Sequence, residues 1–129
     1  TEHGEKKSAV MGCYGIGVSR LISAIIEQNN DDQGITWNEE VSVFDTAIIT
    51  ATGDDEVKEK AEEIYSELSE ESDVLLFEAG KSTGEKFAEA DLIGVNRKII
   101  LGNSFLETGK IEIEYRNGET EELEEIDFI

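Results

Sequence analysis

The residues best suited to chemistry lie in one glycine-rich stretch, MGCYGIGVSR, at positions 11–20. Gly15 and Gly17 would let the backbone approach a ligand closely, because glycine carries no side chain to keep it away. A helix beginning just after them would present N–H groups that attract an anion. Arg20 would add a positive charge and a planar face able to stack on a purine. The stretch therefore predicts a nucleotide site, and the alternative is a tight strand-to-helix turn that carries a surface arginine.

The remaining titratable residues do not predict a metal site or an acid–base pair. His3 has no second histidine or cysteine nearby in the sequence, whereas a metal site needs several such ligands. The carboxylates between residues 56 and 71 would occupy several faces of one helix, which favours a solvated surface. Cys13 is the single cysteine, so no internal disulfide can form, and nothing in the sequence indicates a reactive thiol.

A strand, a turn and a helix are expected to position the glycine-rich stretch. Residues 9–14 are short and mostly apolar, which favours a strand. From Gly17 the apolar residues follow helical spacing and form one stripe: Val18, Leu21, Ile22, Ile25 and Ile26. The polar residues 29–34 end this helix.

The rest of the chain predicts an α/β domain with a mixed sheet flanked by helices. Apolar runs and alternation predict strands, and helical spacing predicts two helices between them. Asn117-Gly118 is a strong hairpin signal. The expected strands are 46–51, 74–77, 98–101, 110–116 and 119–125, and the expected helices are 57–71 and 84–93.

The net charge of −20 is unevenly distributed along the sequence. Residues 1–38 hold five acidic and three basic residues, and residues 39–129 hold 26 and eight, so their formal charges are −2 and −18. Taken alone, a charge of −18 argues against binding a nucleic acid, because it repels a polyanion at low salt. There is no run of 18 apolar residues, so no membrane span is expected. Without a secretion signal, the expected compartment is a reducing cytoplasm.

Longer segments resemble a known enzyme family. MGCYGIGVSRLISAIIEQNNDDQGITW closely resembles the third signature motif of prolyl-tRNA synthetases, which are class II aminoacyl-tRNA synthetases. FDTAIIT, AEEIYSEL, GEKFAEADLIG and RKIILG resemble successive segments of that family's anticodon-binding domain. The resemblance implies a C-terminal fragment: residues 1–38 would end the catalytic domain, and residues 39–129 would form an anticodon-binding-like domain that lacks its last helix.

The resemblance implies a role for each residue of the opening stretch. Arg20 matches the arginine that packs on the adenine of ATP, and Gly15 and Gly17 match the glycines that pass close to the nucleotide. Cys13 would line the pocket near the amino acid substrate, or else be a small buried hydrophobic residue.

The resemblance also implies partners and cofactors for the whole enzyme. ATP with magnesium would be its cofactor. Its partners would be the tRNA for proline, the rest of the catalytic domain and a second subunit of a homodimer. Because the first two signature motifs are missing, this chain alone would need no cofactor and would have no proline–tRNA ligase activity.

Two departures from the family leave an alternative open. The chain has no proline, and other residues stand where the family typically has it: Asn38, Val43, Thr50, Thr83 and Asn96. The family's basic loop after the second strand has one base here, so the candidates for tRNA binding are Lys81, Phe77 and Arg97. Phe77 could instead be a core residue and Arg97 a strand-edge surface residue. The alternative function is a non-catalytic α/β module, isolated or engineered to be free of proline.

Overall fold

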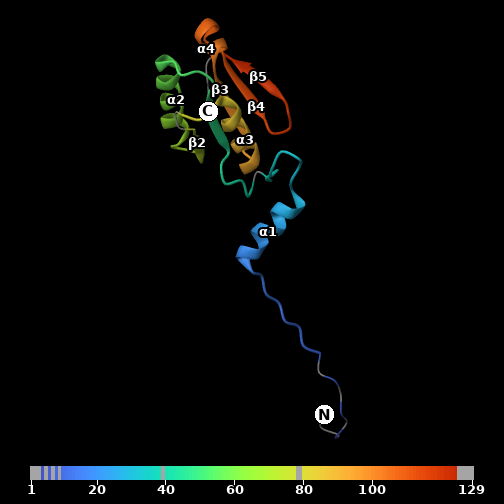
Figure 1. Ribbon diagram of the computed structural model, residues 1–129. Helices are drawn as coiled ribbons and strands as arrows, with labels where there is room; N and C mark the ends of the chain where they lie inside the picture. Colours follow the sequence, from blue (N-terminus) through green and yellow to red (C-terminus); the bar gives the residue numbers. More distant parts are fainter. Residues whose placement is uncertain are drawn as a thin grey trace.

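A computed structural model describes residues 4, 6, 8, 10–38, 40–77 and 80–124 of the chain. In this part of the chain nine helices and strands follow one another (Figure 1). They are α1 (Val18–Gln28), β1 (Thr46–Thr50), α2 (Asp55–Leu68), β2 (Val74–Leu76), α3 (Thr83–Ile93), β3 (Arg97–Leu101), α4 (Asn103–Thr108), β4 (Ile111–Tyr115) and β5 (Thr120–Leu123).

The five strands form one mixed sheet in the order β2-β1-β3-β4-β5. The central strand β1 pairs in parallel with β2 and with β3. The antiparallel strands β4 and β5 extend the sheet beyond β3. The predicted α/β fold with a mixed, helix-flanked sheet is confirmed, and the hairpin forms at the predicted Asn117-Gly118 position between β4 and β5.

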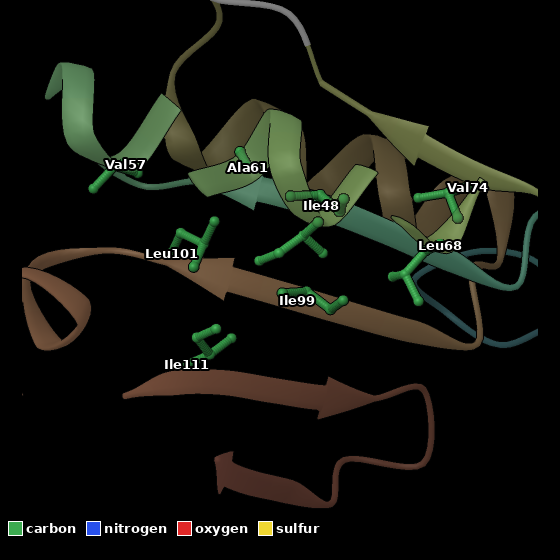
Figure 2. Packing of buried hydrophobic residues seen from close by; sticks show 9 residues of the cluster. Ile48, Val57, Ala61, Leu68, Val74, Ile99, Leu101 and Ile111 are labelled. Atoms are coloured by element: carbon green, nitrogen blue, oxygen red, sulfur yellow. The ribbon is translucent and has the colours of Figure 1, made fainter. Parts of the chain in front are cut away.

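Successive side chains of β1 point to opposite faces of the sheet, and each face has its own core. Ile48 faces α2, and Figure 2 shows it with Ile99 and Leu101 below that helix. Ala47 and Ile49 face the other way, where they pack with residues of α3. The first core consists of Ile48, Val57, Ala61, Ile64, Leu68, Val74, Ile99, Leu101 and Ile111; the second of Ala47, Ile49, Phe77, Ala90 and Val95.

Side-chain caps determine where α2 and α3 begin. The side chain of Asp54 accepts a hydrogen bond from the N–H of Glu56 and so caps α2. Ser82 and Glu85 form a reciprocal capping box at the start of α3, which satisfies N–H groups that have no partner within the helix. Gly94 ends α3 in the left-handed conformation, at a φ of 80°, which glycine adopts without steric cost.

The strand predicted over residues 9–14 does not form in the part of it that the structure describes, residues 10–14. This part is exposed, with Val10 at 99% and Tyr14 at 96% exposure. A strand needs a neighbour for its backbone hydrogen bonds, and no described segment pairs with these residues. The helix expected after Gly17 does form, as α1.

Candidate functional site

A pocket of about 470 Å³ lies at the carboxyl ends of β1 and β2. Ligands of open α/β sheets bind at the carboxyl ends of the strands, where helices leave for opposite faces. The two helices that follow these strands, α2 and α3, do cover opposite faces here. The pocket is lined by Thr50 at the end of β1 and by residues 51–53 after it, by residues 76, 77 and 80–82 at and after the end of β2, by Lys58, Ala61 and Glu62 of α2, and by Thr83 and Lys86 of α3.

The first turns of α3 are attached to the end of β1. Thr83 donates a hydrogen bond from Oγ1 to the carbonyl of Ala51, at 3.3 Å. Lys86 donates from Nζ to the carbonyl of Thr50 at 3.0 Å and to its Oγ1 at 2.8 Å. These bonds bring Lys86 from the helix into the pocket wall.

Lys86 is a buried cation, with 4% of its surface exposed. Both hydrogen bonds of its Nζ go to neutral oxygens of Thr50, and no ion pair joins it to a described residue. Burial lowers the pKa of Lys86 below its ordinary value of 10.5. An ammonium group has three N–H donors, so one donor remains for a ligand.

The other lysines of the pocket are exposed and paired on the surface. Lys81 Nζ lies 2.7 and 2.6 Å from the two carboxylate oxygens of Glu89. Lys58 Nζ lies 2.9 Å from Asp55 Oδ1, and this contact lowers the pKa of Asp55. Surface ion pairs contribute about 0–1 kcal/mol to stability. An incoming anion could therefore replace the carboxylate of Glu89 or Asp55 as the partner of these lysines.

One further polar group of the pocket has no partner among the described residues. Thr52 Oγ1 is buried and makes no hydrogen bond with any described residue. A buried hydroxyl without a partner is unfavourable, and Thr52 lines the same pocket as Lys86. A ligand with polar edges could satisfy both groups at once.

The structure separates the three residues expected to bind tRNA. Lys81 lines the pocket. Phe77 also lines it but is only 8% exposed and belongs to a core cluster, so its ring is part of the wall. Arg97 donates from Nε and Nη2 to Thr46 Oγ1 at 3.0 and 2.8 Å. Thr46 begins β1 and Thr50 ends it, so Arg97 lies about 13 Å along the sheet from the pocket.

Lys86 is the pocket residue that the sequence reasoning missed. Its position held a usable signal: Lys86 and Ala90 are four residues apart and so share one face of a helix. Ala90 is fully buried, so a helix that turns Ala90 inward also turns Lys86 inward.

The residues expected to bind ATP lie apart from this pocket. Gly17 is the N-cap of α1 and Arg20 lies in the first turn of that helix, as the sequence pattern predicts. Gly15 has no heavy atom of another described residue near the position of a Cβ, and Cys13 is exposed. No described segment approaches these residues, so their roles stay predictions.

Neither a metal-binding cluster nor a membrane-spanning helix is seen in the described part of the chain. Among the described residues no three His, Cys, Asp or Glu side chains are grouped so that they could hold a metal ion; His3 lies outside the described residues. No helix in the described part has both the length and the apolar character needed to cross a bilayer.

Residues 45–129 match the family described as the anticodon binding domain. The chain belongs to this family. It is 46% identical over 128 residues, 98% of its length, to a proline–tRNA ligase of Sulfurihydrogenibium sp. (strain YO3AOP1). It is also 43% identical over 97% of its length to that of Francisella tularensis subsp. mediasiatica (strain FSC147) and 41% identical over 99% to that of Chlamydia felis (strain Fe/C-56).

The chain spans 22% of the length of each of these curated relatives. Since the matches cover nearly the whole chain, the resemblance to prolyl-tRNA synthetases is confirmed for the opening segment as well as for the anticodon-binding domain.

Proposed function

We propose that the pocket at the carboxyl ends of β1 and β2 binds single-stranded bases of a tRNA anticodon. The observation that carries the proposal is Lys86, a buried donor that pairs with no described carboxylate, in a domain of the anticodon-binding family. Single-stranded RNA is recognised through bases that are splayed out and hydrogen-bonded on their edges. A volume of about 470 Å³ lies within the usual range for small-ligand pockets.

The polar groups of the pocket suit a base edge that offers acceptors. Lys86 can give its remaining N–H to an acceptor, and lysine pairs well with base oxygens and ring nitrogens. The hydroxyl of Thr52 can donate or accept. Lys81 lies at the exposed rim, where it would contact a phosphate, and Phe77 supplies an apolar wall. Arg97 lies too far away to contact the same base.

In the whole enzyme this chain would serve the charging of tRNA with proline. ATP with magnesium would supply the energy of that reaction. Arg20 would pack on adenine, Gly15 and Gly17 would allow the close approach of the nucleotide, and Cys13 would lie near the amino acid.

The rest of the synthetase and a second subunit would complete the catalytic site in the cytoplasm, and this chain alone would not charge tRNA. The names of the relatives favour this function over an isolated module without a ligase role.

The test is a titration with an RNA hairpin carrying the anticodon stem and loop of tRNA for proline. We expect Lys86→Met to weaken binding about tenfold, the loss of one hydrogen bond to a charged group. Lys110→Met is the matched control, because it also removes one positive charge but lies on the surface of the sheet, paired with Glu122 at 3.2 Å.

The same hairpin with abasic loop positions should bind the wild-type protein at least as weakly as the normal hairpin binds K86M. Equal binding of the hairpin to wild-type protein and to folded K86M would contradict the proposal.

A further inference from the structure

The turn between α1 and β1 packs against the C-terminal end of α3. Within residues 29–37, Ile35 donates its N–H to the carbonyl of Leu92 at 3.4 Å. Trp37 donates from Nε1 to the carbonyl of Ile93 at 2.7 Å. The last carbonyls of a helix have no partner within the helix, so this turn supplies donors that α3 itself lacks. Figure 1 shows the turn in cyan beside α3.

Two glycines allow the backbones of the turn and of α3 to meet directly. A Cβ on Gly34 would clash with the carbonyl of Asp91 and lie 2.6 Å from Leu92 Cα. A Cβ on Gly94 would clash with the carbonyl of Ile35. Gly94 also has a φ of 80°, a conformation that residues with a Cβ rarely adopt. Each side of the contact therefore requires the absence of a side chain.

Arg116, the residue after β4, also binds the turn. Its side chain is only 10% exposed, and its Nη2 lies 2.7 Å from Asp31 Oδ1. It also donates to the carbonyl of Ile35 and to Gln33 Oε1, both at 3.4 Å. Asp31 Oδ1 accepts from the N–H of Gln33 and of Gly34 as well, at 2.8 and 3.0 Å. The bond with Arg116 is the main reason why the pKa of Asp31 is lowered.

The turn is attached to α1 by its own hydrogen bonds. Asn30 and Ile35 form an antiparallel bridge, and Thr36 donates its N–H to the carbonyl of Asn29 at 3.0 Å. Asn29 in turn donates from Nδ2 to the carbonyl of Ile25, in the last part of α1. Hydrogen bonds therefore connect α1, the turn and α3 without a break.

We propose that residues 29–37, Gly94 and Arg116 form a rigid joint that fixes the direction of α1 relative to the pocket. Helix α3 connects the joint to the pocket, since its first turns line the pocket and its last turn contacts the joint. Its 11 residues span about 16 Å. The meaning of the joint for the enzyme rests on the proposed function: it would position the segment of Arg20 relative to the anticodon bases.

The test measures the distance between α1 and the α/β domain in the full chain. Spin labels are attached through Ser23→Cys on α1 and Glu107→Cys on α4, in a Cys13→Ser background, and the distance distribution is recorded by pulsed electron paramagnetic resonance. We expect a narrow distribution with Arg116 present and a distribution at least twofold broader in Arg116→Met. Lys110→Met lies at the opposite end of β4 from Arg116 and outside the joint. It should leave the width of the distance distribution unchanged.

Two further measurements separate loosening of the joint from unfolding and from failure of the proposed function. A label pair within the domain, Ser66→Cys and Glu107→Cys, should keep its distribution in R116M. Trp37→Phe, which removes one hydrogen bond and keeps a ring, should broaden the α1 distribution less than R116M. A broad wild-type distribution, or equal widths in wild type and R116M, would overturn the proposal. RNA binding is measured separately, and R116M should bind the hairpin as tightly as the wild type does.

Discussion

Two buried lysines, at opposite ends of α3, are used in different ways. Lys98 on β3 is 2% exposed and lies 2.5 Å from Asp91 and 3.0 Å from Glu114, with the ring of Phe87 5.5 Å away. Lys86 is 4% exposed, and among the described residues it bonds to Thr50 alone. A buried charge needs a partner. Lys98 has two within the fold, whereas Lys86 keeps one N–H without a described partner, so the comparison separates a structural cation from the proposed binding one.

The largest expected effect is that of removing the structural cation. Lys98→Met would leave the carboxylates of Asp91 and Glu114 partly buried without their cation. Breaking such a pair costs about 3 kcal/mol of unfolding free energy, measured by urea denaturation. Lys110→Met, which breaks an exposed pair, should cost less than about 1 kcal/mol. If the two variants lose the same small amount of unfolding free energy, Lys98 is not a structural cation.

Removing the binding cation should have the opposite sign. Lys86→Met replaces a buried ammonium by an apolar chain of similar length, so at neutral pH we expect the protein to gain about 1 kcal/mol. The pKa of Lys86 is lowered in the folded protein, so at alkaline pH the unfolded chain binds more protons than the folded one. Wild-type stability should therefore rise relative to K86M as the pH increases from that lowered pKa towards 10.5.

The measurement is urea unfolding of both proteins at a series of pH values. The penalty from Lys86 is complete below its lowered pKa and disappears as the group loses its proton. Groups common to both proteins, such as Tyr115, cancel in the difference. A difference in stability that stays constant through the alkaline range would show that burial of the charge is not the cause.

Salt is expected to change the difference in stability between the two lysine variants least. The charge of −18 on residues 39–129 repels itself in the folded state, and the screening length falls to about 3 Å at 1 M salt. We expect the melting temperature to rise between about 0.05 and 1 M salt by a similar amount in wild type, K86M and K98M. A rise confined to one variant would mean that a local pair, not the whole surface, is being screened.

Most of the fold could be predicted from the sequence, because its signals are local. The alternation of residues 111–115, the Asn117-Gly118 turn and the apolar spacing of α2 each specify their element within a few residues. The strand expected at residues 9–14 could not be predicted from its local pattern. A strand depends on a neighbouring strand, and the local pattern does not show whether one is present. The short helix α4 was missed because its six residues contain little periodicity.

The candidate site was predictable only in part. The sequence places Lys81 in the loop that lines the pocket, but it cannot show that Arg97 lies at the far end of the sheet. Distances between residues so far apart in the sequence depend on strand register. Lys86 was overlooked because lysines are usually exposed, and burial of this one follows from the way α3 packs on β1.

The contact between residues 29–37 and α3 changes where one would cut the domain out of a longer protein. The family match begins at residue 45, and a fragment starting there would lose Ile35 and Trp37. The carbonyls of Leu92 and Ile93 would then lack those donors, and Arg116 would lose the carboxylate of Asp31. The smallest piece worth expressing for crystallography or NMR therefore begins at or before Asn29, and sequence families alone would place that border too late.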